Sequence, residues 1–432
     1  MKKQFDIHDI FSPAQEILNP DKFAGRKNSI AKAIKALCRP GTSILVYGER
    51  GAGKTSFIEM VKLIAQDQVE LIHRYKMSRL KPPSGFKYKI LSIECDEDVD
   101  TTEKVLQRLI TSPEGISGLI GPCIEKIETT VKNSLSIKLL QNLMSVGFSG
   151  EEKITAKSFQ EVSVYELFTN LILIINQNVL KEGEGLLITI DEFDRVKDNS
   201  KMASLIKTLS KNKTKFLISG IATSYTELIK AHASIERQLY DGKIKISPMS
   251  DDEIDNLFVL ANRNSNNLIT YEKGFIKEVK ERSYGFPYYV QLFGQLALDH
   301  VISVNGYDNK FRLAKKHLIN GLKEFAEYEP KLEEIYKTVV GNDQERELLL
   351  KALAAQIPNR IDQDNVFGFC RKRGVRDPKK VLSVLLSIKE PEFLKRVDTR
   401  GISFKDPLFK IYSKVRSPLY LKETKEGLSL GQ

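Results

Sequence analysis

The sequence lacks long apolar runs, which argues against a membrane-spanning protein. No stretch approaches the roughly 18 consecutive apolar residues that a membrane span requires, so we expect no membrane partner. The first residues include Lys2, Lys3, Asp6 and Asp9, which leaves no apolar core for a signal peptide. We therefore expect a cytoplasmic protein.

Cysteine is also scarce. The spacing of the cysteines gives neither the CxxC pairs of a zinc site nor the density of a disulfide scaffold. We expect reduced, structural thiols at Cys38, Cys95, Cys123 and Cys370. The chain also has no internal repeat of fixed period, which argues against solenoid and propeller architectures.

Length and charge suggest several domains and an anionic partner. A chain of 432 residues is long for one core and predicts two or three domains. A formal net charge of +11 favours polyanions, although a basic total also serves solubility. Much of the excess lies in the C-terminal part, with a cluster at Arg371, Lys372, Arg373, Arg376, Lys379 and Lys380. This clustering makes duplex DNA a candidate partner.

Short apolar runs separated by amphipathic stretches predict the fold of the first half. The runs cover residues 43–47, 87–94, 186–190, 215–219 and 244–246. Strands that alternate with helices indicate an α/β fold with a parallel, doubly wound sheet. Residues 111–161 are less regular and rich in Ser, Gly and Lys, so we interpret them as an insertion in this domain.

The second half is predicted to be largely helical. Ser250 and Glu253 form a capping box, after which strand signals stop and helices continue to about Tyr328. From Asn342 a third pattern predicts helices over 345–356 and 362–373, a helix capped by Asp377, and a hairpin of strands 393–398 and 402–404. Three helices and a hairpin predict a winged helix. The expected organisation is an N-terminal segment (1–22), an α/β domain (23–249), a helical lid (250–341), a winged-helix domain (342–420) and a tail (421–432).

Residues 48–55 (GERGAGKT) fit the pattern GxxxxGK[ST] directly after the first predicted strand. In such a loop, glycines let consecutive backbone N–H groups surround phosphates at a helix N-terminus. Lys54 is expected to reach the β and γ phosphates, and Thr55 to bind Mg²⁺. A chance match is expected in on the order of 1% of chains this long. We therefore predict an ATP site with Mg²⁺ built from Gly48, Glu49, Arg50, Gly51, Ala52, Gly53, Lys54, Thr55 and Ser56.

Residues 186–192 (LLITIDE) carry the second set of candidate residues, two carboxylates at the end of a buried strand. Open α/β sheets bind ligands at this edge. Asp191 is expected to hold the Mg²⁺ shell, and Glu192 to orient or deprotonate the attacking water. The alternative is a solvated loop, but the position downstream of a phosphate loop favours the catalytic interpretation. Asp194 is expected to be a surface or salt-bridge residue.

This order of elements resembles the AAA+ and STAND ATPases, especially the branch near the origin-recognition and archaeal-type regulatory ATPases. Residues 23–26 (FAGR) resemble a box that precedes the phosphate-loop strand in that group, which implies that Gly25 and Arg26 lie near the nucleotide base. A simple turn is the alternative. Residues 215–224 (KFLISGIATS) resemble the sensor-1 strand, with Thr223 as the best match and Ser219 as its rival.

The resemblance also implies residues contributed by the lid and by neighbouring subunits. Residues 234–237 (SIER) lie where the group carries an arginine near the γ-phosphate, often donated between subunits, so Arg237 is either an arginine finger or an ordinary surface residue. Gly285-Phe286-Pro287 resembles the GxP motif of STAND lids, in which Pro287 packs against the nucleotide; the alternative is an ordinary helix start. Tyr288 and Tyr289 follow where many AAA+ proteins place a sensor-2 arginine, which favours a slow switch over a motor.

Three functions are compatible with these patterns. The first is a regulatory ATPase that exchanges ADP for ATP, changes conformation or forms homo-oligomers, and acts through an effector protein. The second is a DNA-binding initiator or loader that engages duplex DNA through the basic winged helix. Apolar residues over 381–388 leave this helix little polar surface for base contacts. A metabolic kinase is a third, disfavoured by the lid and winged helix.

Overall fold

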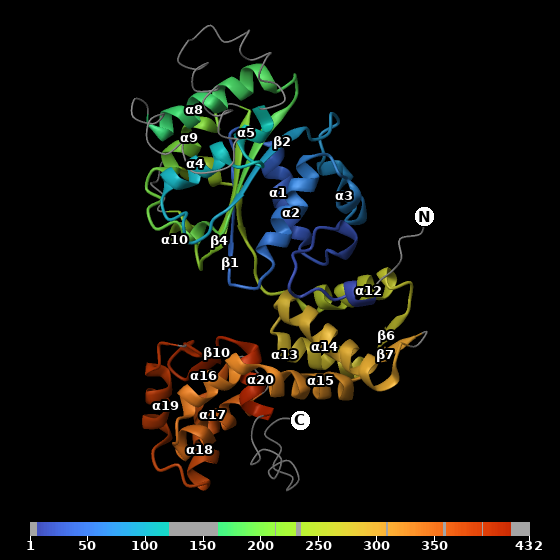
Figure 1. Cartoon of the computed structure of the whole chain (residues 1–432), viewed down its shortest axis with the longest axis vertical. Coiled ribbons are helices and arrows are strands. Elements are labelled where there is room, and N and C mark those ends of the chain that lie inside the picture. The colour runs from blue at the N-terminus through green and yellow to red at the C-terminus, as the bar shows by residue number, and fades with distance from the viewer. Residues whose placement is uncertain are drawn as a thin grey trace. The chain divides into compact units, whose positions relative to one another are not determined.

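The computed structural model describes residues 7–120, 163–211, 213–229, 235–307, 310–356, 360–390 and 392–415. The chain divides into two compact units (Figure 1). One unit, which we name the α/β unit, spans Glu16–Ser247. The other, the helical unit, combines the residues up to Gln15 with those from Pro248 onward. The predicted lid and winged helix thus belong to one unit, which the N-terminal residues join through Phe11, whose ring packs on Phe258.

The α/β unit is built on a five-stranded parallel sheet, as predicted. The strand order is β2-β3-β4-β1-β5. Every pairing in the sheet is parallel. The strands are β1 (Ile44–Gly48), β2 (Tyr88–Glu94), β3 (Gly185–Asp191), β4 (Thr214–Ile221) and β5 (Lys243–Lys245). The sequence therefore predicted all five strands with small errors at their ends.

Helices cover both faces of this sheet (Figure 1). One face carries α1 (Lys27–Cys38), α2 (Lys54–Ala65) and α3 (Glu70–Arg74), and the other carries α4 (Thr102–Thr111), α8 (Val164–Ile174) and α9 (Met202–Leu209). Of the predicted insertion, the structure describes only its start, where Ile116 and Ile120 of α5 (Ile116–Ile120) are buried. Residues 121–161 lie outside the described ranges.

Short elements complete the unit, and a buried lysine fastens α1 to the sheet. The short elements are the helical turns Pro20–Lys22, Ser78–Leu80, Ile175–Val179 and Phe193–Arg195, with α10 (Tyr225–Leu228) and α11 (Glu236–Leu239). The Lys215 ammonium on β4 donates to the carbonyl oxygens of Ala36 and Thr42, each at 3.0 Å, and to that of Arg39. These carbonyls lie at or just beyond the end of α1, where helices leave acceptors unsatisfied. Burial lowers the pKa of Lys215 to about 8.

The first part of the helical unit contains four helices. They are α12 (Asp251–Asn264), α13 (Lys273–Ser283), α14 (Pro287–Asn305) and α15 (Lys315–Tyr328). The predicted capping box between Ser250 and Glu253 is present. The expectation that strands end before this region is wrong, because β6 (Ile269–Tyr271) pairs in parallel with β7 (Phe311–Leu313). Strands of three residues are too short to show a two-residue periodicity.

The last part of the chain packs helices on a small antiparallel sheet. Its helices are α16 (Pro330–Val340), α17 (Gln344–Ala355), α18 (Gln363–Lys372), α19 (Pro378–Ser387) and α20 (Pro407–Val415), and its sheet has the order β8-β10-β9. The strands are β8 (Ile361–Asp362), β9 (Leu394–Arg396) and β10 (Gly401–Phe404). The helices and hairpin lie where the sequence predicts them, and Asp377 caps α19 through a 3.1 Å bond from the Lys380 N–H. Assignment to the winged-helix class stays a prediction.

Two simple expectations can be compared with this structure. Within the ranges given above, no helix is both long and apolar enough to cross a membrane. Three of the four cysteines are described, and all three are free thiols: Cys95 and Cys370 are buried, and Cys38 is exposed. The fourth, Cys123, lies outside the described residues.

Candidate nucleotide-binding site

The glycine-rich loop connects β1 to α2 and has the backbone that its sequence predicts. Gly51 and Gly53 have φ values of 74° and 88°, in the left-handed region that favours glycine. Gly48 has no space for a side chain, because a Cβ atom there would collide with the carbonyl oxygen of Ile246. The first turn of α2 contains no acidic residue. Its unsatisfied N–H groups and the helix dipole therefore favour an anion at this end.

Lys54 is the first residue of α2, and its ammonium donates to the Glu49 carbonyl oxygen at 3.1 Å, across the loop. Burial lowers the pKa of Lys54, while the carboxylates of Asp191, Asp194 and Glu192 oppose that effect. Lys54 thus lies within the electrostatic influence of the acidic residues that follow β3. This is the pairing of loop and carboxylates that the sequence predicts.

The other loop residues have different environments. Thr55, Glu49 and Arg50 are exposed, whereas Ala52 is buried. Ser56 is not directed only at a ligand, because its hydroxyl oxygen accepts a 2.9 Å hydrogen bond from the Ile17 N–H. Ser56 therefore also anchors the segment that precedes α1.

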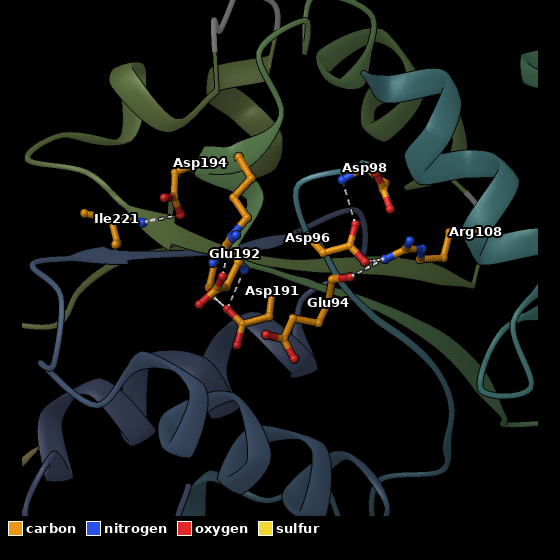
Figure 2. Close-up of polar contacts among 10 residues, drawn as sticks. Glu94, Asp96, Asp98, Arg108, Asp191, Glu192, Asp194 and Ile221 are labelled. Atoms are coloured by element: carbon orange, nitrogen blue, oxygen red, sulfur yellow. Dashed lines mark hydrogen bonds and ion pairs between the residues drawn. The ribbon is translucent and has the colours of Figure 1, made fainter. Parts of the chain in front are cut away.

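The acidic pair lies at the carboxyl edge of the sheet, where Asp191 is the last residue of β3 and Glu192 follows it (Figure 2). The Asp191 carboxylate accepts hydrogen bonds from the Glu192 N–H, at 2.8 Å, and from the Ser219 hydroxyl. Glu192 has a φ of 52°, an uncommon conformation for a residue other than glycine, and its carboxylate forms an ion pair with Arg195. Asp194 has a structural contact, since it accepts a 2.7 Å hydrogen bond from the Ile221 N–H at the end of β4.

The structure brings Ser219, the rival, to the acidic pair and leaves Thr223 elsewhere. Strand β4 lies between β1 and β3, and Ser219 is fully buried on it beside Asp191. Thr223 lies beyond the end of β4, and both its N–H and its hydroxyl donate to Glu227 at 2.8 Å. Ser219 therefore contacts the acidic pair, and Thr223 helps to hold the start of α10; which of the two acts as the sensor stays a prediction.

Glu94 is a site residue that the sequence analysis missed. It ends β2 and is paired in register with Asp191, and its carboxylate lies beside that of Asp191 (Figure 2). Burial raises the pKa of Glu94, and the nearby Glu192 and Asp191 carboxylates raise it further. Arg108 holds this strand end through the Glu94 carbonyl oxygen, at 3.3 Å, and through the Asp96 carboxylate. The available signal was a predicted strand that ends in an acidic residue.

The two residues predicted to lie near the base, Gly25 and Arg26, are held in place by hydrogen bonds to distant parts of the chain. Gly25 has a φ of 70°, and its carbonyl oxygen accepts a hydrogen bond from the Tyr75 hydroxyl. Arg26 is buried and donates to the carbonyl oxygens of Ala52, at 2.9 Å, and Ser247. The Arg26 side chain therefore supports the loop backbone, and its expected role near the base stays a prediction.

The remaining predicted residues lie in short elements. Arg237 is exposed on α11, which suits either a finger or a surface residue; of the motif around it, Ser234 lies outside the described residues. Pro287 is the first residue of α14. The preceding Gly285 has a φ of 79°, and a Cβ atom there would collide with the Met249 carbonyl oxygen. Gly285 is thus required by a close backbone contact, and Pro287 suits the first position of a helix, while its expected contact with the nucleotide stays a prediction.

These residues fit a nucleotide with Mg²⁺. The helix end and Lys54 provide donors and positive charge for phosphates, and Thr55 and Asp191 provide the oxygen ligands that Mg²⁺ prefers. Across the described ranges, no group of three or more His, Cys, Asp or Glu residues is arranged to hold a metal ion by itself. Mg²⁺ is commonly held by one or two carboxylates together with substrate phosphates.

A parallel sheet with a glycine-rich phosphate loop after β1 and an acidic pair after β3 defines a P-loop NTPase. The sequence pattern of the KAP family P-loop domain matches residues 23–246, which is more than half of the chain. The chain therefore belongs to the KAP family of P-loop proteins. No curated protein matches it in sequence.

Several solved structures are similar in overall fold. The Walker-type ATPase PABY2304 of Pyrococcus abyssi has 16% identity and a TM-score of 0.48, over 94% of this chain and 99% of that one. The Aeropyrum pernix Orc1 protein, solved in complex with DNA, has 12% identity and a TM-score of 0.45, over 96% and 97%. Cdc6p from Pyrobaculum aerophilum has 13% identity and a TM-score of 0.44, over 97% and 98%. Similarities at this level support no conclusion about activity.

The two sensor candidates predict opposite outcomes on substitution. We expect Ser219→Ala to reduce ATP turnover by about 10- to 100-fold, because it removes a hydrogen bond that orients a Mg²⁺ ligand. Thr223→Ala is the matched control and should leave turnover within about twofold, because its partner, Glu227, lies outside the acidic pair. Steady-state turnover at saturating ATP distinguishes them, and the reverse order would restore Thr223 as the sensor.

Glu94→Gln should change stability and turnover in opposite directions. The neutral amide removes repulsion with Asp191 and Glu192, so the melting temperature without nucleotide should rise at neutral pH. This gain should shrink as pH falls through the raised pKa of Glu94, because the wild-type carboxyl then also becomes neutral. Turnover should fall by about tenfold, as for other groups that support metal ligands.

Asp98→Asn is the control for this substitution. Asp98 follows the same strand but lies farther from Asp191 than Glu94 does (Figure 2). It should leave turnover unchanged. Full activity of Glu94→Gln at saturating Mg²⁺ and ATP would remove Glu94 from the site.

Proposed function

We propose that this protein binds and hydrolyses ATP and uses the nucleotide state to change its conformation or assembly. The observation that carries the proposal is the placement of Lys54 on the phosphate loop within the field of Asp191 and Glu192. A helix end that favours phosphates faces carboxylates that suit a metal ion and a water molecule. This is the pair of features that phosphoryl transfer to water requires.

The residues would divide the work as follows. The N–H groups at the start of α2 and the Lys54 ammonium bind the phosphates, while Thr55 and Asp191 hold Mg²⁺. Bound Mg²⁺ neutralises charge that develops on the phosphate oxygens. Glu192 orients the attacking water and accepts its proton. The ion pair with Arg195 competes with that water for the Glu192 carboxylate, which favours slow turnover.

Two features support a switch over a processive motor. The chain divides at Ser247 and Pro248 into two compact units, so nucleotide-dependent change is expected where one unit follows the other in the chain. Tyr288 and Tyr289 occupy the positions at which many AAA+ proteins carry an arginine. In this proposal Gly25 contacts the base, Pro287 contacts the nucleotide from the lid, and exposed Arg237 serves a neighbouring copy in a homo-oligomer. Output passes to an effector protein.

Fluorescent ATP binding and turnover in two variants test the assignment. Lys54→Ala should abolish detectable binding, because it removes the cation that contacts the β and γ phosphates. Glu192→Gln should keep binding but lose about 100-fold or more of turnover, the usual effect of removing a general base. Binding of Mg-ATP by Lys54→Ala with wild-type affinity would contradict the assignment of the phosphate loop.

The switch itself requires a structural measurement. Limited proteolysis and size determination should differ between the ADP and ATP states of the Glu192→Gln protein, which holds ATP without consuming it. Identical digestion patterns and sizes in both states would exclude a nucleotide switch while leaving ATP hydrolysis intact.

A second candidate function, engagement of duplex DNA, has one observation in its favour. The α18–α19 corner exposes five basic residues, and α19 directs Ser383 and Ser387 to solvent on the same helix, so more polar surface is available than the sequence suggests. Val384 and Leu386 are half-buried, which leaves the apolar positions largely facing inward. The exposed basic residues are Arg371, Lys372, Arg376, Lys379 and Lys380.

Salt dependence of duplex binding tests this second function. Each phosphate contact should contribute a slope of about −0.9 to log Kobs against log salt concentration. Arg371→Glu with Lys372→Glu should reduce that slope and weaken binding. Lys323→Glu with Lys331→Glu, two exposed lysines away from this corner in the sequence, is the charge-matched control and should not. Equal losses in both variants would indicate a nonspecific effect of net charge.

A further inference from the structure

Arg26 connects two backbone segments of the α/β unit. One terminal guanidinium nitrogen donates to the Ala52 carbonyl oxygen at 2.9 Å, and the other terminal nitrogen donates to the Ser247 carbonyl oxygen. Ala52 belongs to the phosphate loop, and Ser247 is the last residue of the unit. Arg26 is buried, at 8% exposure, and has a φ of 61° at the start of α1. A strained, buried arginine indicates a specific role.

The bond to Ala52 controls one of the phosphate-binding donors. The Ala52 carbonyl and the Gly53 N–H belong to the same planar peptide group and point in opposite directions. Gly53 is the N-cap of α2, so its N–H is among the unpaired donors at the end of the helix that favours anions. A guanidinium on the carbonyl side therefore sets the orientation of that donor.

The last residues of the α/β unit contact the same phosphate loop. The Ile246 N–H donates to the Tyr47 carbonyl oxygen at 2.8 Å, just before the loop begins. Gly48 lies against the Ile246 carbonyl. Residues 246–247, which we name the exit segment, thus contact both the start of the phosphate loop and, through Arg26, its end. The chain continues from here into the helical unit.

We propose that Arg26 is a positioning residue that orients the Ala52–Gly53 peptide for phosphate binding and transmits the state of that peptide to the exit segment. Rotation of the peptide when phosphate binds would move the Ala52 oxygen. The two terminal nitrogens of a guanidinium lie in one rigid plane, so displacement of one bond alters the other. The inference rests on the proposed nucleotide function and adds the route by which the phosphate loop reaches the end of the unit.

Hydrogen exchange of residues 244–250 measures this coupling directly. In the wild-type protein, exchange of the Ile246 amide and its neighbours should differ between saturating Mg-ADP and a slowly hydrolysed Mg-ATP analogue. Arg26→Met keeps an unbranched apolar stem and removes the guanidinium donors. It should bind nucleotide about tenfold more weakly, since one charge-assisted bond no longer orients the loop. At saturation it should lose most of the difference in exchange.

Lys215→Met is the matched control. Lys215 is also a buried cation that donates to backbone carbonyl oxygens of the α/β unit. Its acceptors are in residues 36–42, outside the phosphate loop and the exit segment. The control should lower stability yet keep the nucleotide-dependent difference. Arg26→Lys is the second variant, for use if Arg26→Met does not fold, because a single ammonium nitrogen cannot reproduce the planar, two-nitrogen bridge.

The outcomes separate this inference from the proposed function. If Arg26→Met and Arg26→Lys both keep the wild-type difference, Arg26 does not transmit the state of the loop, although the switch stands. Loss of the difference in Lys215→Met as well would show a general effect of instability and also overturn the inference. If the wild-type protein binds both nucleotides but shows no difference, the switch fails, and the coupling fails with it.

Discussion

The position of β4 between β1 and β3 is the constraint on which the site depends. All five strands are parallel, so their carboxyl ends meet along one edge of the sheet. The phosphate loop leaves β1 at this edge, Ser219 lies near the end of β4, the acidic pair follows β3 and Glu94 ends β2. Residues that are far apart in the sequence become neighbours because each terminates a strand of the same sheet.

The site brings together charged side chains, which are unfavourable when buried or placed near like charges unless an opposite charge or a hydrogen-bond partner is present. Asp191, Glu192 and Glu94 bring negative charge together, and Lys54 lies opposite them. Ser219, Arg195 and Arg108 hold the carboxylates or the strand ends that carry them. Such an arrangement is expected where a bound cation and phosphates balance the charges of the side chains. In the proposed function, nucleotide binding would change these charge interactions and so shift the positions of the side chains.

The same logic extends from the loop to the exit segment. Gly48 begins the phosphate loop and Ala52 lies near its end; Gly48 contacts residue 246 directly, and Ala52 is linked to residue 247 through Arg26. A loop fastened at both ends to the point where the chain leaves the unit cannot change its backbone without affecting that point. This attachment is the physical basis of the proposed switch, and it does not depend on fast ATP turnover.

Sequence alone determined the parallel α/β fold, the phosphate loop and the acidic pair, because glycine spacing and apolar strands have strong local signatures. It also determined the capping box of α12 and the capped start of α19, where a side chain accepts a hydrogen bond from the backbone N–H three residues later. Only the tertiary structure showed that Ser219 contacts Asp191 and Thr223 contacts Glu227, because these contacts depend on strand order rather than spacing. It also revealed Glu94, β6 and β7, and the bridge formed by Arg26, since each depends on contacts between segments distant in the chain.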